Sequence, residues 1–180
     1  MWLRGFVRPM LGDSADGGGS PSFNWLGYNT VGSQSTTGSR RISVPEPART
    51  ALGLSAGDPI YWAFETEIGF LIVARQPLTG NEYKNQGRPV KLGDEHDQYR
   101  VTVPSIFFDD HDGGTDIETP IPEKARVAAG EDRHFVARDA MLDREPRTCY
   151  LLTRRQLEVS MSTDDDRWSD RFATRPQFLR

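Results

Sequence analysis

The alternation of apolar and polar positions is clearest over residues 40–75, RRISVPEPARTALGLSAGDPIYWAFETEIGFLIVAR. Ile42–Pro45 predicts a half-buried strand, because its apolar side chains fall on alternate positions. Pro45 ends this strand because proline cannot donate a ladder hydrogen bond. Apolar runs at Pro59–Phe64 and Ile68–Ala74 predict two further strands, paired as a hairpin.

A short helix is predicted between these strands, over Glu46–Leu52. Pro47 suits its first turn, where a missing N–H costs nothing, and Gly53 suits a left-handed C-cap. Its apolar face consists of Ala48, Ala51 and Leu52. Because a helix below ~12–15 residues is marginal by itself, we expect packing to hold it in place.

The segments on either side complete this reading. Phe23–Val31 is aromatic and β-prone, so we expect a strand there. Residues 32–38 (GSQSTTG) predict a turn that pairs this strand with Arg40–Pro45 as a hairpin. Residues 1–22 form a predicted flexible N-terminal arm, rich in Gly, Ser and Asp towards its end, and the polar residues 76–97 predict a linker.

An internal repeat follows. The segment TPIPEKARVAAG aligns with ISVPEPARTALG when Pro122 is placed on Pro45, and the alignment then matches Val44 with Ile121, Ala48 with Ala125, Arg49 with Arg126 and Gly53 with Gly130. A unit that cannot bury its own face needs a second one. The second copy predicts strands at Tyr99–Phe108 and Ile117–Pro122, a helix at Glu123–Ala129, and a closing hairpin of Arg133–Arg138 and Thr148–Thr153.

The order of a basic strand, V-P, a short helix with Arg, L-G-L and G-D resembles the AbrB/SpoVT/MazE family of swapped-hairpin transcription factors. The likeness is carried by Arg41, Ile42, Val44, Pro45, Ala48, Arg49, Leu52, Gly53, Leu54, Gly57 and Asp58. It implies a mainly β fold with short helices, a swapped-hairpin (AbrB-like) β-barrel built from two tandem ββαββ units. The expected division is an N-terminal arm (1–22), a first unit (23–80), a linker (81–97), a second, degenerate unit (98–159) and a C-terminal tail (160–180). The barrel forms either within one chain, as a monomeric pseudo-dimer, or in a homodimer.

The resemblance also implies duplex DNA as a partner and the arginines as its contacts: Arg40, Arg41, Arg49 and Arg126. A guanidinium suits this role because it donates bidentate hydrogen bonds to phosphates and base edges. The net charge is −4, so a nucleic-acid surface must be local. Residues 1–80 carry six basic and six acidic side chains, against nine and twelve in residues 98–159, which favours the first unit. The alternative is structural ion pairing, for example of Arg49 with Glu46.

Catalytic and metal-binding motifs are weak. Nucleophile-elbow, zinc-protease, P-loop and Rossmann fingerprints are absent from the sequence, so we predict a protein that is not an enzyme and has no cofactor or metal. Asp109, Asp110, Asp112 and Asp116 around His111 partly imitate a calcium loop without its bidentate glutamate, which favours an acidic hairpin tip. His96 and His134 are interpreted as linker and strand residues, and Cys149 as a buried core thiol.

The remaining expectations concern location and partners. No apolar run approaches the ~20 residues of a membrane helix, and the first residues lack a signal-peptide core, so we predict a cytoplasmic protein. The tail (160–180) is polar with three aromatic anchors, Trp168, Phe172 and Phe178, which predict a protein-binding segment resembling that of MazE-type antitoxins. The alternative function is a non-catalytic assembly protein, antitoxin-like or part of a virion or other particle, with the barrel as scaffold and both termini as docking arms.

Overall fold

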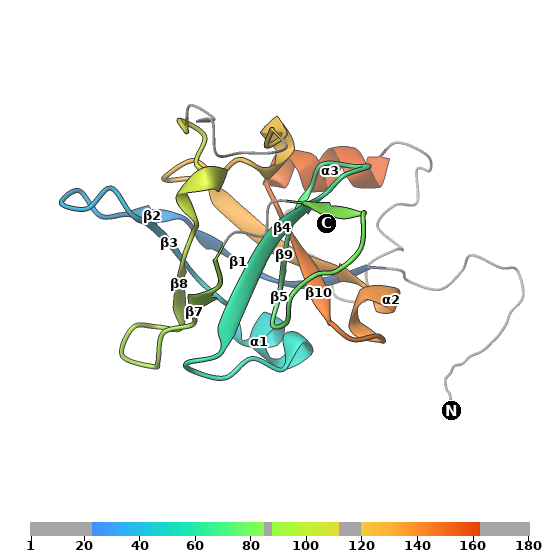
Figure 1. Ribbon diagram of the computed structural model, residues 1–180, viewed down its shortest axis with the longest axis horizontal. Coiled ribbons are helices and arrows are strands. Elements are labelled where there is room, and N and C mark those ends of the chain that lie inside the picture. Colours follow the sequence, from blue (N-terminus) through green and yellow to red (C-terminus); the bar gives the residue numbers. More distant parts are fainter. Residues whose placement is uncertain (1–22, 85–87, 112–119, 163–180) are drawn as a thin grey trace, which may run out of the picture.

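The computed structural model describes residues 23–84, 88–111 and 120–162, which form a mainly β fold with short helices (Figure 1). Its larger sheet has the strand order β1-β9-β10-β5-β4-β6, with β7 also paired to β4. These strands are β1 (Phe23–Thr30), β4 (Pro59–Glu65), β5 (Leu71–Ala74), β6 (Tyr83–Lys84), β7 (Val90–Lys91), β9 (Asp132–Arg138) and β10 (Thr148–Leu152). A second sheet contains β2 (Gly32–Ser33), β3 (Arg40–Ser43) and β8 (Arg100–Thr102). Within the described residues neither sheet closes into a barrel.

The helices are short. They are α1 (Glu46–Leu52), α2 (Asp139–Leu142) and α3 (Arg154–Ser162), with 3-10 turns η1 (Ser105–Phe107) and η2 (Glu123–Ala125). None of the described helices has the length and apolar character that a membrane crossing needs. The bounds predicted for α1 are confirmed, and Gly53 caps it in the left-handed conformation with φ 68°. Packing holds it, since Ala48 and Leu52 are buried.

The two predicted closing hairpins are both present. β4 pairs with β5 from Tyr61↔Ala74 to Phe64↔Leu71, and β9 pairs with β10. β5 begins at Leu71, later than predicted, because residues 65–70 form a turn in which the Gly69 N–H donates to the Glu65 carbonyl at 2.8 Å. The hairpins are joined through their last strands, β5 and β10, which pair antiparallel with Val73 opposite Cys149. A local twofold axis between the hairpins would produce the same pairing.

The predicted partner of β1 is wrong. β1 pairs with β9, from Phe23↔Arg138 to Thr30↔Asp132, with a bulge between Trp25 and Tyr28. The predicted hairpin with β3 survives only at its tip, where β2 pairs with β3. Below the tip, the Asn29 side-chain amide donates to the Ser43 carbonyl at 2.7 Å in place of a backbone ladder. The strand is thereby free to cover β9, which is buried along its middle.

The second copy departs from prediction in its first half. The strand expected at Tyr99–Phe108 is only β8, because Pro104 follows it closely and begins the 3-10 turn η1. The helix expected at Glu123–Ala129 is the single turn η2. Residues 120–122 are not in a strand, and the rest of the strand expected at Ile117–Pro122 lies outside the described residues.

The segment predicted to be a linker adds strands to the sheet. β6 and β7 both pair with β4, through Phe64↔Lys84 and Ile60↔Val90. The leucines at positions 78 and 92 are almost fully buried and anchor the segment against the core. Isolated apolar residues in a polar stretch therefore determine its position.

Candidate functional sites

Arg41 and Arg100 line one polar cavity of about 320 Å³ on the smaller sheet. Ser43 lies directly opposite Arg100 in the β3–β8 register, and Arg41 lies two residues away on the same face. The intervening pair, Ile42 and Val101, is buried on the other face. The cavity is completed by hydroxyl, amide and glycine residues, without a carboxylate among its described lining: Thr30, Gly32, Ser33, Gln34, Ser43 and Gln98.

Both guanidinium groups keep unused donors. Arg41 donates one hydrogen bond to the Gln34 side chain at 2.9 Å, and Arg100 donates one to the Asp97 carbonyl at 2.8 Å. A guanidinium has five N–H donors, so most of them remain available in each case. The cavity lies at the base of the β2–β3 hairpin, which projects from the body in Figure 1. We define the surface around Arg41 and Arg100 as the hairpin face.

The backbone beside this cavity is held in an unusual conformation. Gln98 and Tyr99 have φ values of 57° and 50°, a left-handed geometry that non-glycine residues rarely adopt. Tyr99 is fixed by two contacts, because its carbonyl accepts from the Val44 N–H at 3.0 Å and its ring lies 3.8 Å below the Arg49 guanidinium. Such strain persists only where surrounding contacts enforce it. The turn is therefore a fixed edge of the hairpin face.

Arg40 points away from that face. Its guanidinium pairs with Asp109 at 2.5 Å and Asp110 at 3.2 Å, donates to the Val127 carbonyl at 2.7 Å and lies over the Phe108 ring. Its side chain is 12% exposed. Arg40 thus ties β3 to the segment after η1, and the two aspartates interpreted as an acidic hairpin tip serve as its partners.

Arg49 and Arg126 occupy matching positions in the two copies. Arg49 donates to the Val44 carbonyl at 2.6 Å, and Arg126 donates to the Ile121 carbonyl at 3.2 Å, five residues back in each case. Arg126 also donates to the His111 carbonyl at 3.1 Å. The predicted alternative of an Arg49–Glu46 ion pair is not what Arg49 forms. Of the four predicted DNA contacts, the structure places only Arg41 on the hairpin face.

Sequence reasoning missed Arg100. The β3–β8 register brings it to Arg41, and a signal for that register was present in the alternation of Arg100, Val101 and Thr102. That alternation was assigned to a longer strand in a separate unit, so the pairing with β3 was not expected.

The histidines give no catalytic arrangement among the described residues. His134 is buried, accepts from the Trp25 indole N–H at Nδ1 (3.1 Å) and stacks on Tyr28. Burial lowers the pKa of His134 to about 4, opposed by Asp132 and aided by Arg154. His96 lies in an exposed turn. Across residues 23–84, 88–111 and 120–162, no group of three or more potential ligands is placed to hold a metal ion.

Cys149 is a buried core thiol, as predicted, in β10. Burial raises its pKa well above the ordinary value, so the thiolate that reacts as a nucleophile is disfavoured. The aromatic anchors Trp168, Phe172 and Phe178 lie outside the described residues, as do most of both predicted docking arms.

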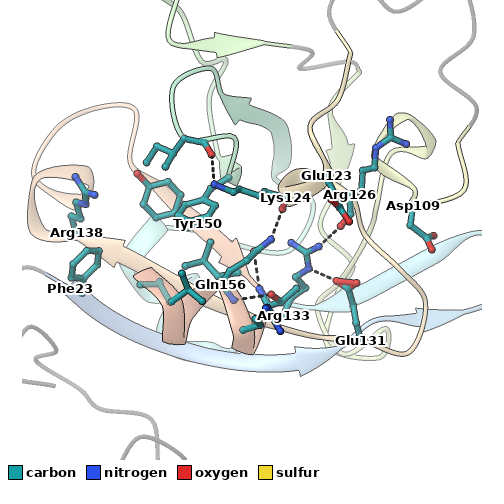
Figure 2. Close-up of a pocket in the computed structure, with 17 residues that line it drawn as sticks. Phe23, Asp109, Glu123, Lys124, Arg126, Glu131, Arg133, Arg138, Tyr150 and Gln156 are labelled. Atoms are coloured by element: carbon teal, nitrogen blue, oxygen red, sulfur yellow. Dashed lines mark hydrogen bonds and ion pairs between the residues drawn. The ribbon is translucent and has the colours of Figure 1, made fainter. Parts of the chain in front are cut away.

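A second cavity lies between α3, η2 and the β9–β10 hairpin (Figure 2). Its volume is about 950 Å³, and we call it the α3 groove. Figure 2 shows Arg138 and Phe23 at one end, Asp109 at the other, and Lys124, Tyr150 and Gln156 between them. The apolar side chains that line it include Phe70, Val136, Tyr150 and Leu152.

Comparisons with family models, curated proteins and solved structures find no match to this chain.

Proposed function

We propose that the protein is a DNA-binding transcriptional regulator of the AbrB/SpoVT type, and that it contacts duplex DNA through Arg41 and Arg100 on the hairpin face. One observation carries this proposal: two arginines with unused donors line the same cavity, and its described lining holds no carboxylate. The proposal replaces Arg40, Arg49 and Arg126 as DNA contacts, because their guanidinium groups are engaged within the fold.

The chemistry of the cavity favours a phosphate of the duplex backbone. Guanidinium groups bind phosphate oxygens through charge-assisted, often bidentate hydrogen bonds. Hydroxyls of Thr30, Ser33 and Ser43 and the amide of Gln34 can add neutral hydrogen bonds to the same oxygens. The uncharged β2–β3 tip would then lie against the adjacent groove. Phosphate contacts position a protein on DNA without reading its sequence, so this face supplies affinity more than specificity.

The fine architecture belongs to the same proposal: two tandem AbrB-like units interlock within one chain about a local twofold axis. The antiparallel pairing of β5 with β10 supports it, as do the matching contacts of Arg49 and Arg126. The first copy would present DNA-binding arginine, while the second would complete the interior.

The experiment is a fluorescence anisotropy titration of random-sequence duplex DNA with the full chain. We expect Arg41→Glu/Arg100→Glu to weaken binding by at least about tenfold, because two phosphate contacts become repulsive. The matched control is Lys84→Glu/Lys91→Glu, which changes net charge equally at two exposed positions outside this cavity. Equal losses in both variants would reduce the effect to overall charge, and unchanged affinity in Arg41→Glu/Arg100→Glu would exclude the assigned contacts.

A second function, a non-catalytic assembly protein, is favoured by one observation. Arg40 and its counterparts Arg49 and Arg126 stabilise the fold, and the net charge of −4 works against general attraction to DNA. Deleting residues 1–20 and 163–180 separates the two functions. A DNA-binding protein keeps its duplex affinity after this deletion, whereas an assembly protein that docks through its arms loses its partner.

A further inference from the structure

The α3 groove combines an apolar floor with unneutralised positive charge. Phe70 and Tyr150 form an edge-to-face pair with ring centroids 5.7 Å apart, and Val136 and Leu152 continue this surface. The Tyr150 hydroxyl donates to Glu65 at 2.5 Å. Burial, then this hydrogen bond, raise the pKa of Tyr150, so the phenol stays a neutral part of the floor. Aromatic and aliphatic lining of this kind is typical of sites for small organic ligands.

Two of the three acidic side chains along the groove are already neutralised. Asp109 pairs with Arg40, and Glu131 pairs with Arg133 at 2.5 Å. Arg133 is itself fully used, because it also donates to the Leu151 and Arg126 carbonyls. Among the described residues, only Glu123 lines the groove as a carboxylate without an ion pair.

The cations of the groove are not balanced in the same way. Lys124, Arg138 and Arg155 all line it and are exposed, and none has an ion pair with a described residue. Lys124 donates only to the Ile68 carbonyl, at 3.4 Å, and lies 5.5 Å from the centre of the Phe70 ring. An ammonium group therefore lies directly beside the aromatic floor, and Figure 2 shows it on the same side as Tyr150.

We propose that the α3 groove binds a small amphipathic organic anion, with an aromatic or alicyclic body on the Phe70–Tyr150 floor and its acidic group at Lys124 and Arg155. The volume of about 950 Å³ lies within the range of ligand sites, roughly 300–1,000 Å³. The apolar body removes the floor from water, and the acid group gains charge-assisted hydrogen bonds from cations that have no carboxylate partner. This site is distinct from the hairpin face and does not depend on DNA binding.

The test uses two fluorescent probes that differ in one group. Anilinonaphthalene sulfonate has an aromatic body and an anionic group, and phenylnaphthylamine is the same body without the sulfonate. Titrated into the full chain, the anionic probe should saturate a single site and bind at least about tenfold more tightly than the neutral one. In Lys124→Glu/Arg155→Glu this preference should disappear, while Lys84→Glu/Lys91→Glu should keep it.

Three results would overturn the proposal. The first is equal affinity for both probes, which would indicate non-specific apolar binding. The second is an unchanged preference in Lys124→Glu/Arg155→Glu, which would place the anion elsewhere. The third is binding with many weak sites. Far-ultraviolet circular dichroism of each variant checks that the fold is intact, and single substitutions Lys124→Gln and Arg155→Gln provide milder variants if the double one unfolds.

Discussion

The two copies of the repeated motif, residues 44–53 and 121–130, begin alike and end differently. Each starts with a proline in extended conformation, Pro45 with φ −61° and Pro122 with φ −67°. Each buries an alanine completely three residues later, and each ends at a glycine with positive φ. The arginine after the alanine donates to the carbonyl five residues before it in both copies. Shared residues therefore make shared contacts, although the elements around them differ.

The copies diverge at the residue after the arginine. In the second copy Val127 forms a parallel bridge with Phe108, donating to the Phe107 carbonyl at 2.7 Å and accepting from the Asp109 N–H at 3.1 Å. These bonds hold Val127 out of the helix and limit η2 to one turn. In the first copy Thr50 continues the helix and Leu52 packs into the core. Helix length is thus decided by tertiary contacts after the motif, and β-branched valine suits the extended alternative.

The largest predicted effect concerns the glycine beside each proline. A Cβ on Gly27 would lie 2.8 Å from Pro45 Cβ, whereas a Cβ on Gly69 would lie 3.4 Å from Pro122, and both glycines have positive φ. We expect Gly27→Ala to lower the free energy of unfolding by about 3 kcal/mol, from backbone strain plus a clash with a rigid ring, and Gly69→Ala by about 1 kcal/mol from strain alone. Urea unfolding measures both. Equal losses would mean that the two prolines are not seated as described.

The next effect tests how β9 of the second copy joins β1 of the first. His134 lies between Trp25 and Tyr28, and its pKa in the fold, about 4, is below the ordinary 6.5. The unfolded chain therefore binds a proton between these values while the folded protein does not, so stability falls as pH drops from about 6.5 to 4. Its contribution is about 2 kcal/mol between pH 7 and pH 4.5. Unfolding at both pH values should show this loss, and His134→Gln should remove that part of it; an equal slope in the variant would contradict the burial of a neutral imidazole.

The smallest effect separates structural arginines from binding ones. Arg49→Met and Arg126→Met should each lower the free energy of unfolding by about 1 kcal/mol, because each removes carbonyl hydrogen bonds. Duplex DNA affinity of the folded variants should stay unchanged. Arg41→Met should do the reverse, leaving stability nearly unaltered and weakening DNA binding. Reduced DNA affinity in Arg49→Met, with stability intact, would return that residue to the interface.

Much of the fold could be predicted where local signals and burial agree. Helix α1 has a proline, a glycine cap and an apolar face, and its bounds were right. The closing hairpins were predicted from apolar runs, since strands buried on both faces need no alternation. The partner of β1 was missed because strand pairing depends on which surfaces remain uncovered in the whole fold, and the sequence of Phe23–Val31 alone does not contain that information.

The candidate sites were harder to predict than the elements. Arginine type and position made Arg40, Arg41 and Arg49 look alike in sequence. Their roles were separated by neighbours distant along the chain: Asp109 for Arg40 and Tyr99 for Arg49. The α3 groove was not anticipated, because its lining comes from both copies and from α3.

The central claim is that the two copies interlock within one chain through β5 and β10, and one engineered pair tests it. Cys149 is the chain's only cysteine, and Val73 lies directly opposite it in the antiparallel register. Directly paired positions of this kind have Cα atoms about 4.5–5.5 Å apart, within the range a disulfide can bridge. Refolding Val73→Cys under mild oxidation should give an intrachain disulfide, seen as a monomer on a non-reducing gel with no free thiol. A cross-linked dimer, or two unreacted thiols, would contradict the account.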